Sequence, residues 1–303
     1  MRKRDIGGSV RAIIASVCYA TNPLFALPLY ALGLTANSVL FYRYLFSVII
    51  YSVIVLCFKK VSLAISLKQG GVLLFLGVIF SMTCLLMYES FNYIDSGIAC
   101  TMLFVYPIMV AVIMAVFFKE KFTFTTLVSL LLSFSGICLL CETSDKVIDF
   151  RGVWLVVLSA LCYALYIVAV KKIPMVKTIK LEKLNFYIML VTLGVFYVNS
   201  SFGLELQILS SAKELFLVCM LAIVPTILSI ETMNVAIKLI GSTRTSIIGA
   251  LEPITAVVIG AMVFGEVVTY KTGLGIFLVI TGVLVIVMKG FKTDKKKLKK
   301  QKV

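Results

Sequence analysis

The 303-residue chain contains no histidine and few charged residues. Without histidine it cannot hold a metal site, a catalytic triad or a proton relay that depends on imidazole. Only 14% of its residues are charged, against about a quarter in an average soluble domain, which excludes a soluble globular enzyme. The 61% share of apolar residues also excludes a disordered chain. Such a composition is typical of a protein that lies in a lipid bilayer.

The apolar residues form long unbroken runs, unlike the alternating pattern of an outer-membrane barrel. A helix that spans a bilayer needs about 20 mostly apolar residues. Breaks at charged or polar residues divide the sequence into runs at 10–31, 36–58, 70–92, 97–118, 124–142, 151–170, 184–202, 214–237, 244–265 and 270–289. The sequence therefore predicts an all-α integral membrane protein with ten transmembrane helices. Because the connections are short, any activity has to lie within the helices.

The net charge of +15 is unevenly distributed between the connections. If both termini are cytoplasmic, most of the 29 Lys and Arg residues fall on the cytoplasmic side, which is the positive-inside pattern. We expect the basic tail from about residue 290 to lie near anionic lipid and expect no nucleic-acid partner. The first run is too long for a cleaved signal peptide, so we expect insertion into a bacterial cytoplasmic membrane.

The eight cysteines lie in or beside the apolar runs and are expected to act as small apolar residues. Cys138 and Cys141 have the C-x-x-C spacing, but no second pair completes a zinc site. The nucleotide-binding pattern G-x-x-x-x-G-K-[ST] does not occur either. We therefore expect no metal and no cofactor.

The second half of the chain repeats the first. A shift of 146 residues aligns 94–140 with 240–286 and pairs identical residues that composition explains poorly, among them Ser96/Ser242, Pro107/Pro253, Glu120/Glu266 and Gly136/Gly282. Each half, 1–145 and 146–303, contains five runs, and an odd number makes the second copy enter from the opposite side. The sequence thus predicts two inverted five-helix repeats, as in many secondary transporters whose substrate site lies between the repeats.

A charged side chain at the centre of a bilayer costs about 2.5–3.5 kcal/mol on insertion scales, so each one requires a partner or a role. Glu252 lies about 13 Å along its helix from the cytoplasmic end, close to the midplane. Pro253 follows it, and the repeat places Tyr106-Pro107 at the matching depth. We predict a substrate cavity walled by Tyr106 and Glu252. The alternative is that Glu252 only braces helix packing.

Two further sets of charges lie within predicted spans. Arg43 and Glu89 both belong to the outer part of the membrane, where we predict an ion pair that is either a brace or an extracellular gate. Glu231, Asn234 and Lys238 form a stripe on the eighth run. A pair between Glu231 and Lys238 or Arg244 would make an inner gate. The alternative is a charge pair near the helix end whose side chains snorkel toward the aqueous phase.

Smaller polar and structural signals complete the prediction. Asn22 lies near mid-depth in the first run with Tyr19 one turn back, and Tyr163 is the repeat partner of Tyr19. These groups suit an amphipathic solute, although each could also be a packing residue. The prolines expected to kink membrane helices are Pro23, Pro107, Pro225 and Pro253. The small residues of the fifth and tenth runs should pack within the protomer or form a homodimer seam.

Ten helices arranged as five plus five resemble the drug/metabolite transporter (DMT) superfamily, and within it the proteins built from EamA domains. The most specific stretch runs from Ser242 through Leu251-Glu252-Pro253 to Gly265-Glu266. It resembles the family pattern of an acid-proline pair in the ninth helix and a Gly-Glu at the helix end. Arg43 lies where these proteins often carry an arginine. The first half departs from the pattern, with Tyr106 in place of the acid.

The inverted repeat and the midplane polar groups predict a secondary active transporter that works by alternating access. The resemblance implies that the solute is an amino acid or a related amphipathic metabolite, with export favoured over import. Protons are a candidate coupling ion through Glu252 or Glu89. An acid among aromatic residues would also suit import of a cationic amine. The remaining alternatives are a membrane enzyme for lipid-linked substrates, which the residues do not favour, and a membrane partner that transports nothing.

Overall fold

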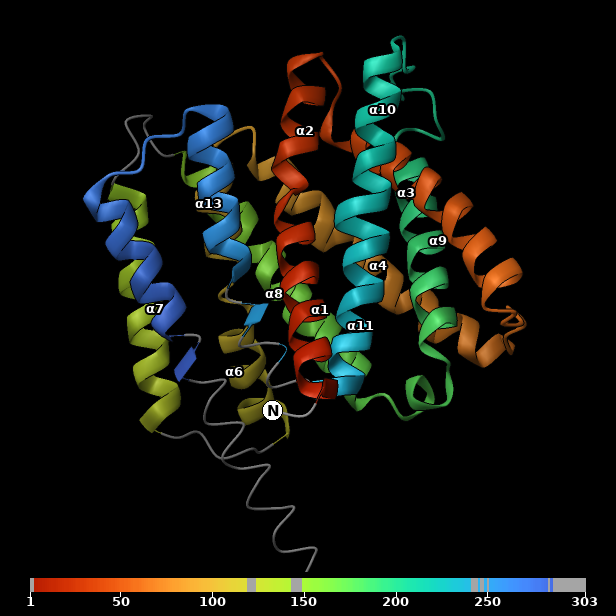
Figure 1. The fold of residues 1–303 in the computed structure, drawn as a ribbon, viewed down its shortest axis with the longest axis horizontal. Coiled ribbons are helices and arrows are strands. Elements are labelled where there is room, and N and C mark those ends of the chain that lie inside the picture. The colour runs from red at the N-terminus through yellow and green to blue at the C-terminus, as the bar shows by residue number, and fades with distance from the viewer. Residues whose placement is uncertain are drawn as a thin grey trace, which may run out of the picture.

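The computed structural model describes residues 3–118, 124–142, 149–240, 245, 248–249, 251–282 and 284–285. Within these residues every regular element is a helix (Figure 1). Seven helical stretches are long and apolar enough to cross a membrane, namely Ile6–Ala31, Ala36–Phe58, Leu67–Ser90, Ser96–Phe118, Phe150–Val170, Leu181–Asn199 and Ala212–Ala236. They coincide with seven of the predicted runs, and each helical stretch keeps the number of its run. The helix α7 (Phe124–Glu142) and the shorter apolar helices Leu251–Phe264 and Tyr270–Gly282 lie at the other three.

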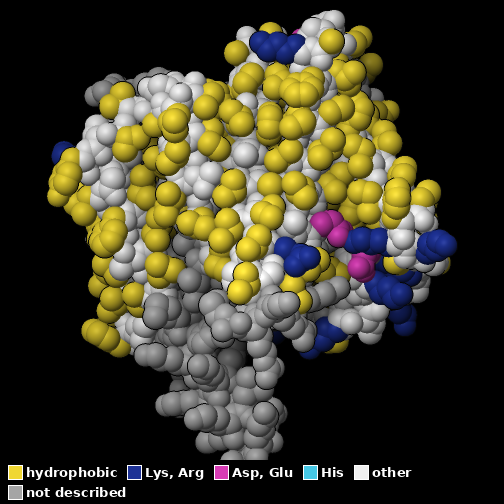
Figure 2. All heavy atoms as spheres, in the orientation of Figure 1, with side chains coloured by type: hydrophobic (Ala, Val, Ile, Leu, Met, Phe, Trp, Pro, Cys, Tyr) yellow, Lys and Arg dark blue, Asp and Glu magenta, His cyan; other side chains and the backbone are white. Residues whose placement is uncertain are grey.

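The surface of the helices is apolar. Large side chains that expose more than half of their area are spread over the bundle and include Phe75, Phe134, Trp154, Phe216 and Phe277. Figure 2 shows hydrophobic side chains over most of one face, with the charged ones gathered mainly at its lower right and upper tip. A soluble monomer rarely exposes an apolar patch of this extent. The chain is therefore a multi-pass membrane protein.

Two of the spans are broken in mid-course. The first consists of α1 (Lys3–Ala20) and α2 (Asn22–Ala31), which meet at Thr21, and Pro23 stands in the first turn of α2. Proline fits the first turn of a helix because no intrahelical donor is needed there. The fourth span consists of α5 (Ser96–Leu103) and α6 (Tyr106–Phe118), with a turn at 104–105 between them.

The eighth span changes its winding around Pro225. It runs from α10 (Ala212–Leu221) through the π-helical segment η3 (Ala222–Leu228) into α11 (Ser229–Ile240). Pro225 has no N–H to donate to the carbonyl of Leu221 one turn earlier. The π-helical winding pairs each carbonyl with the N–H five residues on, which brings Thr226 to the Leu221 carbonyl. The hydroxyl of Thr226 also donates to that carbonyl, at 2.9 Å.

The remaining helices are α3 (Ala36–Val53), the π-helical η1 (Ile54–Phe58), α4 (Leu67–Ser90), α8 (Phe150–Lys172), the 3-10 helix η2 (Pro174–Thr178), α9 (Leu181–Asn199) and α13 (Leu251–Phe264). They pack in pairs that the repeat relates. The first span contacts the eighth through α1 and α11, and the sixth contacts the third through α8 and α4. The second span pairs with the seventh through α3 and α9, and the fourth with the ninth through α5 and α13. If the two halves are exchanged, the α1–α11 pair corresponds to the α8–α4 pair. The α3–α9 and α5–α13 pairs each correspond to themselves.

The helix α7 and the Tyr270–Gly282 helix approach closely through small residues within one protomer. A side chain built on Gly136 of α7 would lie 2.7 Å from the carbonyl oxygen of Gly275 and 2.9 Å from the backbone nitrogen of Val279. Both residues belong to the Tyr270–Gly282 helix. In Figure 1, α7 and this helix stand together at one edge of the bundle. The small-residue face therefore joins these two helices, and a homodimer seam here would have to use their outer faces.

Candidate functional site

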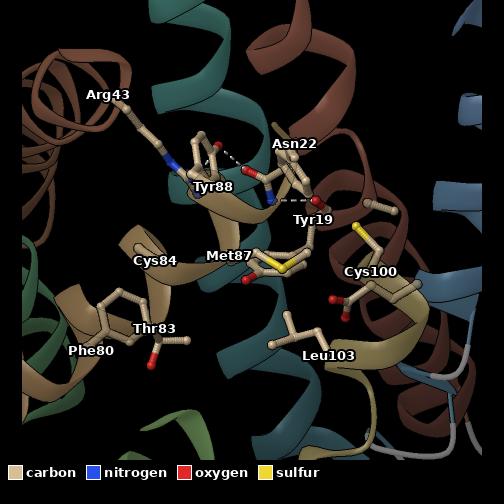
Figure 3. A pocket seen from close by; sticks show the side chains of 13 residues that line it. Tyr19, Asn22, Arg43, Phe80, Thr83, Cys84, Met87, Tyr88, Cys100 and Leu103 are labelled. Carbon is tan, nitrogen blue, oxygen red and sulfur yellow. Dashed lines mark hydrogen bonds between the residues drawn. The ribbon is translucent and has the colours of Figure 1, made fainter. Parts of the chain in front are cut away.

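A narrow internal cavity lies where α1, α2, α3, α4, α5 and α13 meet (Figure 3). Its wall contains Tyr19, Ala20, Asn22, Arg43, Phe80, Thr83, Cys84, Met87, Tyr88, Phe91, Cys100, Leu103 and Glu252. The space open to the centre of a water molecule is about 20 Å³, which admits water but not an organic solute. The helices have to move apart before a metabolite can occupy it.

The interruptions of the helices border this cavity. Tyr19, Ala20 and Asn22 flank the break at Thr21, and Leu103 precedes the break between α5 and α6. Glu252 of α13 lies on the wall of the same cavity. Irregular backbone at membrane depth is tolerated where it is buried in protein or lines a cavity, and discontinuous helices commonly form the substrate sites of transporters.

Arg43 is the centre of a hydrogen-bond network on one side of the cavity. Only 4% of this residue is exposed. Its Nε donates to Thr226 Oγ1 and its Nη1 donates to the hydroxyl of Tyr88, each at 2.7 Å. The Tyr88 hydroxyl in turn donates to Asn22 Oδ1 at 3.0 Å, and Asn22 Nδ2 donates to the carbonyl of Tyr19 at 2.6 Å (Figure 3). The network links the second, third and eighth spans to the break in the first.

The predicted ion pair between Arg43 and Glu89 is wrong for this conformation. Glu89 accepts a hydrogen bond from Asn92 at 3.2 Å, while Arg43 bonds to the preceding residue, Tyr88. Adjacent residues of a helix point about 100° apart, so α4 turns Tyr88 toward Arg43 and Glu89 away from the cavity wall. The part of the chain that the structure describes provides no carboxylate partner for Arg43.

Glu252 faces the same cavity from the other half of the chain. Its side chain is half-buried, and no described residue forms a hydrogen bond or ion pair with its carboxylate. An ionised carboxylate in an apolar environment is costly unless a cation, a proton or hydrogen bonds compensate it. Glu252 is therefore an unsatisfied acceptor that a positively charged group or a proton would complete. Pro253 follows it in the first turn of α13 and is buried.

Tyr106 does not form the opposite wall of the cavity as predicted. Its ring instead packs against Tyr163, with ring centroids 4.6 Å apart and planes nearly perpendicular. Tyr163 lies beside Tyr166. The ring of Tyr166 packs against that of Phe80 on the cavity wall, with ring centroids 5.2 Å apart. The opposite side of the cavity is formed by Arg43, Tyr88 and Asn22. The two predicted tyrosines thus make an aromatic layer behind Phe80 rather than the cavity surface.

Glu231 has a described partner that the sequence did not predict. It forms a salt bridge with Lys59, at the end of the second span. Its other oxygen accepts a hydrogen bond from Tyr51 at 2.5 Å. The pairing joins the second and eighth spans near the end that the charge pattern assigns to the cytoplasm. Asn234 lies on α11, whereas Arg244 and the side chains of Lys238, Pro107, Cys138 and Cys141 lie outside the described residues.

A second carboxylate joins the two halves at the far end of α13. Glu266 accepts hydrogen bonds from the backbone nitrogen and hydroxyl of Ser96, at 3.0 and 2.7 Å, and from the nitrogen of Gly97, at 3.2 Å. These groups form the N-terminus of α5, where unpaired N–H groups favour an anion. In the sequence, Glu266 and Ser96 stand out only as repeated residues, and no pattern connects them. Tyr88 and Thr226 are not evident as site residues there, although Thr226 directly follows a proline in mid-span.

Comparisons with known proteins give a consistent assignment. The profile of the EamA-like transporter family matches residues 7–141 and again residues 150–288. An uncharacterized transporter of Archaeoglobus fulgidus is 24% identical over 200 residues, which cover 65% of this chain and 70% of the relative. A protein known from a crystal structure shares the fold with a TM-score of 0.68 at 13% identity, over 94% of this chain and 98% of that one.

Proposed function

Because the chain belongs to the EamA-like transporter family, we propose that it is a secondary active transporter that moves a small metabolite through the cavity at Glu252. The observation that carries the proposal is the position of this carboxylate. It lies unpaired among the described residues, in α13 and beside the breaks of two other spans. Such a group gives a polar solute a binding site inside the membrane.

The proposal includes ten spans in two inverted repeats, with both termini in the cytoplasm of a bacterium. Two features support the inversion. In Figure 1, α1 begins at the lower end of the bundle and α13 ends near the upper end. The start of α8 lies at that upper end as well, because Gly152 contacts Tyr93 and Ile94, which directly precede the helix end held by Glu266. The first spans of the two halves thus start at opposite ends.

Alternating access requires the cavity to open to one side at a time. The bonds of Glu266 to Ser96 and Gly97 close the outer end of the α5–α13 contact in this conformation. The Glu231–Lys59 pair closes the opposite end between the second and eighth spans. Both join one half of the chain to the other. We propose that they are the outer and inner gates, and that the described conformation is closed on both sides.

The single carboxylate in the cavity favours exchange of solute for protons. A positively charged group of the solute and a proton would bind to the Glu252 carboxylate alternately, because either one neutralises its negative charge. Inward movement of protons would then drive a metabolite outward, so the proposed direction is export. The proposed solute is an amino acid or a related amphipathic metabolite, since the rest of the wall combines aromatic and sulfur-containing side chains with Asn22 and Tyr88.

Import of a cationic amine is the second candidate. Glu252 and the surrounding aromatic rings of Tyr19, Phe80 and Phe91 would suit an alkylammonium group. This candidate predicts binding of amines that lack a carboxylate.

The test is a thermal-shift screen of the detergent-purified protein, followed by transport in proteoliposomes. The screen covers amino acids, polyamines, quaternary amines, nucleosides and sugars. A ligand at about 100 times its Kd adds about 2.7 kcal/mol to the stability of the folded protein. A compound that stabilises the protein is then loaded into proteoliposomes, and its efflux is followed with and without an acidic exterior. We expect the proton gradient to accelerate efflux by the wild-type protein.

Glu252→Gln keeps the shape of the side chain but removes its charge, so we expect at least a tenfold loss of efflux and of the response to the gradient. Glu89→Gln is the matched control, because Glu89 is a membrane acid that does not line the cavity. Equal rates and equal gradient responses of wild-type and Glu252→Gln proteins would disprove the role of Glu252. If no compound in the panel is bound or moved, the proposed transport function itself fails.

A further inference from the structure

The guanidinium of Arg43 retains unused hydrogen-bonding capacity. An arginine has five N–H donors on three nitrogens. The bonds found among the described residues use Nε and Nη1, and no bond involves Nη2. The Tyr44 and Tyr88 rings lie 5.4 and 5.6 Å from the central carbon of the guanidinium. These neighbours fix the orientation of the group, yet all of them are neutral.

The cavity therefore has a guanidinium and a carboxyl group on its wall and no internal pair between them. Arg43 lies on the second span and Glu252 on the ninth, and both line the space. Their charged groups are not within salt-bridge distance of each other, because Lys59–Glu231 is the salt bridge found among the described residues. Each buried charge needs compensation. One solute that carries both signs would compensate both.

We propose that Arg43 binds the carboxylate of the transported solute and that the solute is a zwitterion, with its ammonium group at Glu252. The proposal rests on the transport function and specifies the substrate class of the same site. Arginine suits this role because its planar fork can bind a carboxylate through two parallel hydrogen bonds. Tyr88 and Thr226 hold the fork in place. Phe80, Met87 and Leu103 provide apolar surface for the remainder of the solute.

The proposal separates the two candidates for the solute. A cationic amine would satisfy Glu252 but would bring a second positive charge into the cavity beside Arg43, where like charges repel. A simple carboxylate would satisfy Arg43 and leave Glu252 without a partner. Both should therefore bind more weakly than the zwitterion of the same carbon skeleton.

The experiment measures binding of matched probes to the full-length protein in detergent. One set is L-leucine, 3-methylbutylamine and 4-methylpentanoate, and the other is L-phenylalanine, 2-phenylethylamine and 3-phenylpropanoate. Within at least one set we expect the amino acid to bind at least tenfold more tightly than the amine and the acid. This comparison uses only the wild-type protein, so it does not depend on the folding of a variant. An amine that binds as tightly as its amino acid would overturn the zwitterion proposal while leaving transport intact.

Variants of Arg43 and Glu252 test which group of the solute each residue binds. Arg43→Gln should lower the preference for the amino acid over the amine by at least tenfold, whereas Arg43→Lys should keep part of it. Glu252→Gln should lower the preference for the amino acid over the acid. If Arg43 only supported the fold, its variants would weaken all three probes of a set equally, and that result would refute the assignment. Failure of every probe in both sets would also refute the zwitterion class, while the wider metabolite screen would still test the transport function.

Discussion

At the scale of single residues, Thr226 connects a backbone irregularity to the cavity. Its hydroxyl donates to the Leu221 carbonyl in the π-helical segment around Pro225, and it accepts from Arg43 Nε. One hydroxyl therefore bonds to the irregular backbone and orients a charged group of the cavity. The residue is almost entirely buried, with 1% exposed. Removal of the hydroxyl leaves the Nε donor of Arg43 without this partner.

We expect Thr226→Val to destabilise the protein by about 1–3 kcal/mol, the cost of leaving buried polar groups unsatisfied. Thermal unfolding of the purified protein measures the effect. The matched control is Thr232→Val, because the hydroxyl of Thr232 donates only to carbonyls of its own helix, those of Leu228 and Ser229. Equal unfolding temperatures of the two variants would show that Thr226 has no special structural role.

At the scale of helices, the contact between α5 and α13 depends on a glycine. The carboxylate of Glu266 folds back over Gly260 and occupies the space that a larger side chain at this position would need. Gly265 makes this return possible, since its φ of +67° lies in the left-handed region that ends many helices. The chain thus reverses after α13 and brings Glu266 to the N-terminus of α5.

Gly260→Ala should displace the Glu266 carboxylate and release the N–H groups of Ser96 and Gly97. We expect their hydrogen exchange to become at least tenfold faster, which mass spectrometry of peptides covering 94–103 would detect. Gly273→Ala is the control, because nothing lies within 4 Å of a side chain built there. Unchanged exchange in Gly260→Ala would mean that the Glu266 bonds do not control the opening of this contact.

At the scale of the whole molecule, the helices that end the two halves, α7 and Tyr270–Gly282, pack against each other at one edge of the bundle. Gly136 allows α7 to approach the Tyr270–Gly282 helix so closely that backbone atoms limit the distance. Helices in a bilayer gain stability from such close packing, because lipid is as apolar as their side chains. The outward side chains Phe134 and Phe277 are 67% and 64% exposed, so they form the surface available to lipid or to a second protomer.

Gly136→Ala should push these two helices apart and destabilise the protein by about 1–3 kcal/mol, as overpacking does in other cores. Gly273→Ala again serves as the control, and it should be neutral or stabilising since alanine favours helices over glycine by about 1 kcal/mol. Thermal unfolding of both variants gives the comparison. A Gly136→Ala protein as stable as the wild type would show that the close approach is not needed.

The sequence by itself determined the helical membrane character, the position of seven spans and the family. These follow from hydrophobic run length and residue identities, which local sequence carries completely. It also singled out Glu252, Arg43 and Asn22, whose side chains all line the cavity. Polar residues in an apolar run are conspicuous because burying them is costly.

Only the tertiary structure decided which side chains meet. Arg43 bonds to Tyr88 and Thr226 rather than to Glu89, and Glu231 pairs with Lys59, a partner that the sequence did not predict. Sequence position gives the depth of a residue in the membrane, but not the rotation of its helix or the identity of the neighbouring helix. A rotation of about 100° separates Tyr88 from Glu89. Such rotations follow from the packing of all the helices together, and they determine the charges that a solute meets in the cavity.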